Sequence, residues 1–212
     1  RLKRLTDNVL DVTKIESKSL KLNKEPINLN IIIAEVLKEY TSKIRHRNIR
    51  GERDRQFPSD VKISYELKHK DDDIIIEADK NRLAQVMSNL LSNALKFSEK
   101  EHEARISIIV EKNFLEAGNQ TIVVSIKDYG EGINPAIFPN MFSKFVSSSY
   151  SGTGLGLYIC KNIIQAHGGK IWAENNRNSR GATFYFMLPI SADKQLDYKV
   201  QQNEQEIKHF TR

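Results

Sequence analysis

The sequence lacks the features of a disulfide-stabilised, zinc-binding or membrane-spanning protein. Its single cysteine, Cys160, can form neither an internal disulfide nor a cysteine-built zinc site, and it fits a reducing compartment. No run of apolar residues approaches the roughly 18 that a membrane-spanning helix needs. The composition, with 39% hydrophobic and 28% charged residues, is instead typical of a folded globular chain. A length of 212 residues allows one or two domains.

The printed residues begin at Arg1, inside an amphipathic pattern, and include no initiator methionine and no pattern typical of a signal peptide. Leu2, Leu5, Val9 and Val12 alternate at spacings of three and four, which predicts a helix with a heptad-like stripe. A helix this short is marginal alone. We therefore expect it to belong to a hairpin or bundle, and the chain to be a piece of a longer protein.

The net charge of +6 and the pI of about 9.3 leave two interpretations open, a nucleic-acid partner or a solvated basic surface. The basic stretch 43–55 is interrupted by acidic residues and carries no interleaved aromatic residues. This pattern favours the solvated surface, so we expect no nucleic-acid partner.

Hydrophobic periodicity predicts helices and strands that do not alternate as regular βαβ units. Strands that read as hairpin pairs favour an α+β fold, a two-layer sandwich with helices on one face of a mixed sheet, preceded by an N-terminal helix. Pro26 precedes the second helix, for which Asn28 or Asn30 is the expected N-cap. The expected helices are 2–15, 31–44, 80–97, a short one around 136–145, and 155–167; the expected strands are 61–67, 74–78, 104–114, 120–129, 170–175 and 182–189; 45–60 is expected to be a charged loop and 191–212 a polar tail.

The helix at 80–97 carries the first candidate site. Asn89 and Asn93 are four residues apart at the edge of the apolar stripe, and Lys96 follows one turn later. Asparagine is a mediocre helix former, so these side chains either form a solvated polar flank or serve a function. An amide oxygen is a suitable ligand for Mg²⁺, which prefers hard oxygen donors, and Lys96 can meet a phosphate.

Two further candidate sites contain glycines. In the segment 128–133, Asp128 follows a long apolar strand and precedes Gly130 and Gly132. This pattern is typical of a plain turn. It also suits a binding site in which the Asp128 carboxylate accepts from the exocyclic amine of adenine and the glycines allow the ring to approach the backbone. In the segment 151–157, three glycines open an apolar helix, whose N-terminus can bind phosphate. This segment is neither a Rossmann turn, which follows a strand, nor a P-loop, which contains Gly-Lys-Ser/Thr.

In this order and spacing the three sites resemble the ATP-binding domain of sensor histidine kinases, in the superfamily that also includes DNA gyrase. Residues 81–98 are similar to the N box of that family, 128–133 to its G1 box, 142–145 to its F box and 152–157 to its G2 box. The segments 167–176 and 181–189 are similar to its closing strands. The resemblance implies a Bergerat-type ATP-binding fold over residues 28–190, with 1–25 as the second helix of a dimerisation hairpin and 191–212 as a tail.

The resemblance also implies roles for single residues. Asn93 would be the Mg²⁺ ligand, Asn89 and Lys96 would lie near the phosphates, and Asp128 would read adenine with Gly132 against the ring. Phe142 and Phe145 would anchor a short lid over about 146–153, although ordinary core packing also suits both. The residues implied in nucleotide binding are Asn93, Lys96, Phe97, Asp128, Gly130, Gly132, Ile133, Phe145, Gly152, Thr153, Gly154, Leu155, Gly156, Leu157 and Thr183.

The mechanism that the resemblance implies is transfer of the ATP γ-phosphate to a histidine and from there to a response regulator. In the hydrolases of the superfamily a glutamate activates water one turn before the Mg²⁺-binding asparagine. Here that position is Asn89, whose amide cannot act as a general base, and this disfavours a gyrase-like ATPase. The acceptor histidine is expected on a helix before Arg1, so none of the five histidines should serve, and His167 is expected at a helix end.

Two departures from the family pattern keep an alternative open. The lid is short, and Val146 stands where the family often carries a basic residue. A non-catalytic nucleotide-binding scaffold, a pseudokinase, is therefore the second hypothesis. For the intact protein the resemblance implies a homodimer, a response-regulator receiver domain as partner, and ATP and Mg²⁺ as cofactors. This part of the chain is expected in the cytoplasm without membrane contact, and both an anchored and an unanchored parent protein fit the sequence.

Overall fold

The computed structural model describes residues 2–50, 60–68, 73–98, 103–114, 120–147 and 152–190. Its main sheet has five strands in the order β2-β4-β5-β7-β6. Only the β2–β4 pair is parallel, so the sheet is mixed as predicted. The strands are β2 (Asp60–Leu67), β4 (Glu103–Phe114), β5 (Gln120–Asp128), β6 (Lys170–Asn175) and β7 (Ala182–Ile190).

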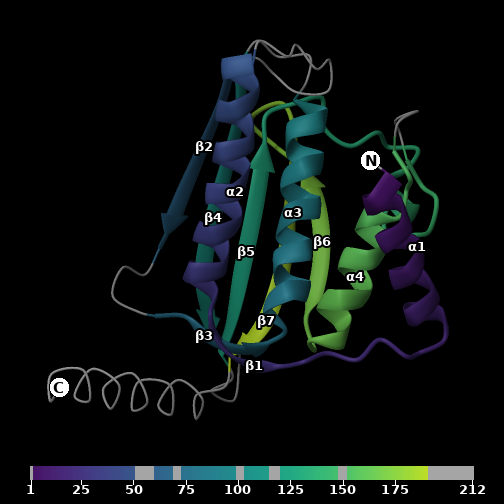
Figure 1. Cartoon of the computed structure of the whole chain (residues 1–212). Helices are drawn as coiled ribbons and strands as arrows, with labels where there is room; N and C mark the ends of the chain where they lie inside the picture. The colour runs from purple at the N-terminus through teal and green to yellow at the C-terminus, as the bar shows by residue number, and fades with distance from the viewer. Residues whose placement is uncertain are drawn as a thin grey trace, which may run out of the picture.

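Three helices cover one face of this sheet, α2 (Leu29–Arg50), α3 (Lys80–Phe97) and α4 (Gly156–Ala166), and α1 (Leu2–Glu16) lies against the outer side of α4 (Figure 1). The apolar stripe predicted for α3 is fully buried. It meets a row of alternate residues on β5, namely Ile122, Val124 and Ile126. This α+β sandwich confirms the predicted fold class.

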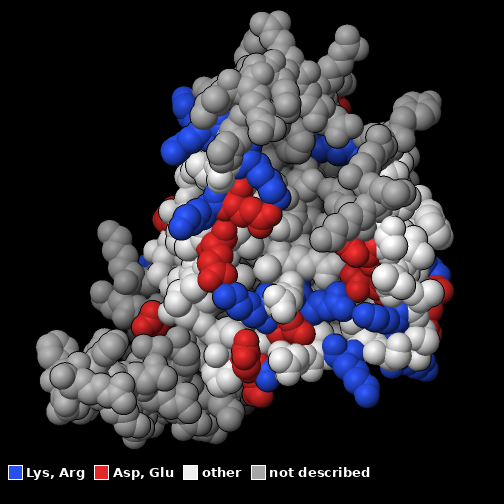
Figure 2. All heavy atoms as spheres, in the orientation of Figure 1, with Lys and Arg blue, Asp and Glu red and all other residues white. Residues whose placement is uncertain are grey.

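Alternation along the strands decides which side chains face the helices. On β5 the inward row of even-numbered residues ends at Asp128, which is therefore buried on the helix side. On the opposite face, the rings of Trp172 and Tyr185 stack with their centroids 5.1 Å apart. The outer surface of the helices carries basic and acidic side chains interspersed with one another (Figure 2).

A second, two-stranded sheet corrects the predicted strand pairing. Periodicity suggested a hairpin between 61–67 and 74–78, but β3 (Ile75–Ala78) pairs antiparallel with β1 (Glu25–Asn28), while β2 joins the main sheet. Strand β1 was not predicted, because four residues that include Pro26 carry little pattern. Proline is tolerated there since β1 is an edge strand.

Two helix predictions also need correction. Helix α2 extends to Arg50, so the expected loop 45–60 is wrong over 45–50, and residues 51–59 lie outside the described part. Asn28 is the N-terminal cap of α2, and its Oδ1 accepts from the Asn30 backbone N–H at 3.0 Å. The helix expected around 136–145 is only a three-residue 3-10 helix, Phe138–Asn140, flanked by turns. The predicted tail 191–212 lies outside the described residues.

His167 ends α4 and joins it to the start of α3. Its Nδ1 lies 2.8 Å from the Ile163 carbonyl oxygen, and its Nε2 accepts from the Asp79 backbone N–H at 3.0 Å, which fixes a neutral ring. Asp79 in turn caps α3 by accepting from Arg82 N–H, and it also accepts from Asn23 N–H in the segment that leads from α1. A buried ring with both nitrogens engaged is a structural residue, as predicted.

We expect His167 to make the stability of the fold depend on pH. Burial lowers the pKa of its ring below the ordinary 6.5, so the unfolded chain binds a proton more readily than the native state. The contribution of the neutral ring is complete above about pH 6.5 and is lost as the pH falls below that value. Urea unfolding between about pH 8 and pH 5.5 should show a larger loss of stability in the wild type than in His167→Gln. Parallel losses in the two proteins would contradict this account.

Among the described residues, no helix is long and apolar enough to span a membrane.

Candidate nucleotide-binding site

One cavity opens between α3, the loop after β5 and the N-terminus of α4. Most of the predicted site residues line it, although they come from widely separated parts of the sequence. They are Asn89, Asn93, Lys96, Phe97, Asp128, Gly132, Ile133, Gly152, Thr153, Gly154, Gly156 and Leu157.

The α3 wall of the cavity follows from the burial of that helix. Because the apolar stripe faces the sheet, Asn89, Asn93 and Lys96 are turned to the edge that borders the cavity. Asn89 lies opposite the first residue of α4, with its Cγ 3.7 Å from the position that a β-carbon on Gly156 would take. Its buried Nδ2 has no hydrogen-bond partner in the described part of the chain. An unsatisfied buried donor is costly, and a turn of the amide toward the cavity would let a ligand oxygen satisfy it.

Asp128 forms the opposite end of the cavity and is only 2% exposed. Its Oδ1 accepts from the backbone N–H groups of Gly130 at 3.0 Å and Ala182 at 3.2 Å. Burial raises the pKa of the carboxyl, and the two N–H groups partly offset that effect. Oδ2 accepts no hydrogen bond within the described residues, so it is left for a ligand donor such as an exocyclic amine.

The loop after β5 is held in place by two asparagines that sequence reasoning did not single out. Asn175 Oδ1 accepts from Ile133 N–H at 2.7 Å, and its Nδ2 donates to the Ile133 carbonyl at 3.1 Å. Asn176 Nδ2 donates to the Asp128 carbonyl at 2.9 Å. Gly130 does not line the cavity, but a side chain there would meet the Phe97 carbonyl oxygen at 2.2 Å. These contacts fix the backbone that presents Asp128.

The glycine-rich segment packs against the chain just before the predicted lid. Phe145 N–H donates to the Gly154 carbonyl at 3.0 Å, and a β-carbon on Gly154 would lie 2.4 Å from the Phe145 carbonyl carbon. Gly154 also has a φ of +65°, so both sterics and conformation favour glycine. A β-carbon placed on Gly152 would lie 3.2 Å from Lys96 Nζ. Lys96 thus reaches the glycine-rich end of the cavity.

Besides Gly130, three predicted nucleotide contacts do not line the cavity. Phe145 is 73% exposed, so it is not an ordinary core residue, whereas Phe142 is half-buried and packs on the core. Leu155 is buried beneath the loop. Thr183 points away from the face that carries Phe184 and donates to Asn176 Oδ1 at 2.7 Å, which gives it a supporting position. Residues 148–151 of the predicted lid lie outside the described part.

Several residues of the cavity wall were missed, because isolated small or apolar residues give no motif. Met141 and Phe184 are apolar wall residues that periodicity assigns to the core. Asn8 comes from α1, a helix that no motif links to the cavity. The missed residues are Asn8, Ser92, Asn134, Ile137, Met141, Ser147, Ala182 and Phe184.

Residues 78–192 match the family model of histidine kinase-, DNA gyrase B- and HSP90-like ATPases. The chain belongs to this ATPase family. Within the family it is a histidine kinase-type catalytic domain, because the catalytic domain of histidine kinase ThkA is 33% identical, superimposes with a TM-score of 0.63, and is matched over 81% of this chain and 99% of that one.

Longer relatives agree with this assignment. The sensor protein KdpD of Clostridium acetobutylicum is 34% identical over 88% of this chain and 19% of its own length. The adaptive-response sensory kinase SasA of Prochlorococcus marinus is 34% identical over 88% of this chain and 45% of its own length. The chain therefore spans less than half of either relative.

We expect Asp128→Asn to separate nucleotide binding from folding. The amide can still accept from Gly130 and Ala182 through its oxygen, and it removes a buried charge, so the melting temperature should not fall by more than about 2 °C. ATP affinity should fall about tenfold or more, since a hydrogen bond to a charged group contributes about 1.5–3 kcal/mol. Isothermal titration calorimetry and a thermal melt test this.

The wild type should also bind ATP in preference to GTP, because guanine offers an acceptor where adenine offers an amine. Equal binding of ATP and GTP by the wild type, or unchanged ATP affinity in Asp128→Asn, would contradict the assignment of Asp128.

Proposed function

We propose that this chain binds Mg-ATP and donates the γ-phosphate to a histidine that lies outside residues 1–212, as part of a sensor histidine kinase. The observation that supports this most strongly is the single cavity, which unites an asparagine-bearing helix, a buried aspartate and a glycine-rich helix start. Bound ATP would supply the phosphoryl group, and the chain would position it.

The oxygen ligands that the cavity offers suit an Mg²⁺ ion that also binds a triphosphate. The described residues contain no group of three or more histidine, cysteine or acidic side chains that could hold a metal ion by themselves. The cavity offers instead the neutral amides of Asn89 and Asn93. Mg²⁺ usually takes few protein ligands and keeps phosphate and water oxygens. The resemblance to the histidine kinase family assigns the protein ligand to Asn93.

The residues at the glycine-rich end would bind and orient the phosphates. The Asn89 amide would turn its Nδ2 toward the phosphates, Lys96 would supply positive charge, and the backbone of 152–157 lies at the N-terminus of α4. None of these groups is a general base for water. The site therefore favours transfer to another protein side chain through positioning and charge stabilisation over rapid hydrolysis.

The remaining parts of the proposal concern the intact protein. Residues 1–25 would be the second helix of a dimerisation hairpin and 28–190 the catalytic domain. The intact protein would be a homodimer, with this part of the chain in the cytoplasm. A response-regulator receiver domain would be the final acceptor. ThkA has been solved in complex with the response regulator TrrA, and that ThkA chain is 30% identical with a TM-score of 0.64 over 91% of this chain.

A longer chain that restores the helix before Arg1 tests the transfer. Incubation with radiolabelled ATP should yield a phosphorylated protein with the acid-labile linkage of phosphohistidine. Asn93→Ala should abolish labelling, whereas Asn81→Ala, on the same helix but outside the cavity, should not. ATP binding without any phosphohistidine would contradict the proposal and favour the scaffold alternative.

A further inference from the structure

Helix α1 contributes a side chain to the cavity. Asn8 is only 5% exposed and lines the cavity together with Asn89. Asn8 and Asn89 also line a second, polar groove between α1 and α3. These two residues therefore lie where the cavity meets the groove. No side-chain hydrogen bond to Asn8 is present among the described residues, although its neighbours on the same helix are well paired.

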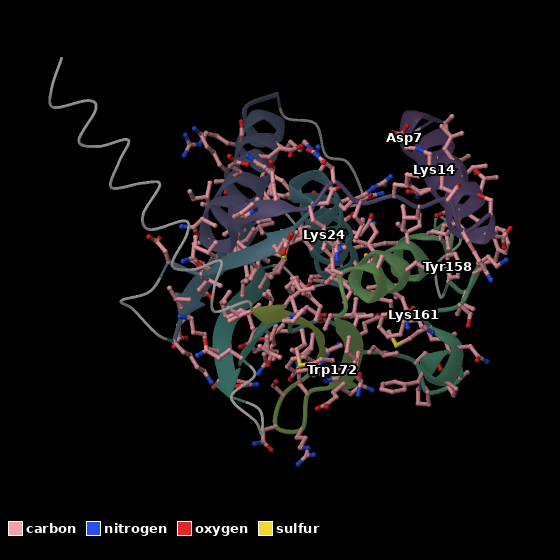
Figure 3. The ribbon with its side chains drawn as sticks, turned by 90° about the horizontal axis from the view of Figure 1, so that it is seen from below. Asp7, Lys14, Lys24, Tyr158, Lys161 and Trp172 are labelled. Atoms are coloured by element: carbon pink, nitrogen blue, oxygen red, sulfur yellow. The ribbon has the colours of Figure 1, made fainter. Side chains whose placement is uncertain are left out.

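Specific contacts hold α1 in this place. Asp11, which is buried, accepts from Arg82 Nη1 at 2.7 Å and from Gln85 Nε2 at 2.6 Å, and both partners belong to α3. Glu16 forms an ion pair with Lys144, just before Phe145. Figure 3 shows α1, marked by Asp7 and Lys14, lying beside α4, marked by Tyr158 and Lys161. Both contacts follow Asn8 along α1, one to α3 and the other to the chain before the lid.

The location of Asn8 within the cavity identifies what it can contact. Asn89 faces Gly156 at the glycine-rich end. Asp128 lies near the C-terminal end of α3, because Gly130, which donates to Asp128, packs against the Phe97 carbonyl. Because Asn8 shares the groove with Asn89, it belongs to the glycine-rich end, where the terminal phosphate would lie. An asparagine amide offers two N–H donors, which suit phosphate oxygens.

We propose that Asn8 is a further ligand-binding residue, whose side-chain amide donates to the terminal phosphate of ATP while α1 is docked on α3 and α4. This inference rests on the proposed binding of ATP. It makes α1 part of the nucleotide site, so the binding of ATP and the docking of α1 stabilise each other by linkage. ADP, which lacks the terminal phosphate, does not receive this contact.

Calorimetric titration of the whole chain with ATP and with ADP, each with and without Mg²⁺, tests the proposal. Asn8→Ala should weaken ATP binding about tenfold and ADP binding less than about twofold. Asn8→Asp should weaken ATP binding further, because a carboxylate repels phosphate. Val9→Ala, an exposed neighbour that lines neither the cavity nor the groove, should bind both nucleotides like the wild type.

Hydrogen exchange of the α1 amides provides a second readout that does not depend on affinity. In the wild type, saturating ATP should slow exchange in residues 2–16 more than saturating ADP does, and Asn8→Ala should remove that difference. Equal losses for ATP and ADP, unchanged ATP binding in Asn8→Ala, or wild-type ATP binding in Asn8→Asp would each overturn the assignment of Asn8. Failure of the wild type to bind any adenine nucleotide would refute the proposed function itself.

Discussion

The burial of α3 is the constraint on which the site depends. Its apolar stripe, from Leu83 to Leu95, is held between the main sheet and the neighbouring helices. That packing leaves only one orientation for the polar edge, so Asn89 and Asn93 must face the cavity. A rotation of the helix by one residue would turn them about 100° and expose part of the stripe. The same interactions that stabilise the core therefore place the amides that face the ligand.

The other side of the cavity depends on the end of β5 in the same way. Asp128 continues the inward row of that strand, and burial there would be costly without its two backbone donors. The donors come from the following loop and from β7, and Asn175 and Asn176 hold that loop. The carboxylate proposed to bind adenine is thus held by backbone N–H groups from two segments that are far apart in the sequence.

Sequence reasoning was most successful where a pattern is long or chemically specific. The apolar stripe of α3 and the strands β4 and β5 predicted the fold class. The order of the three motifs predicted most of the residues that line the cavity. Sequence-based prediction was wrong where contacts between distant segments determine the secondary structure. The four residues of β1 are a strand only because β3 pairs with them. Helix α2 continues to Arg50 through charged residues that the sequence pattern assigned to a loop. Asn8 carries no motif at all, and only the docking of α1 brings it to the cavity.

The central claim is that one cavity holds ATP with adenine at Asp128 and phosphates at the glycine-rich end. Backbone amide shifts of the isotope-labelled chain, recorded by NMR during titration with a Mg²⁺-bound non-hydrolysable ATP analogue, test this directly. The largest changes should fall on Gly130, Gly132, Asn93 and residues 152–157. Changes confined to the opposite face of the sheet around Trp172 and Tyr185, or no changes at saturating ligand, would contradict the account.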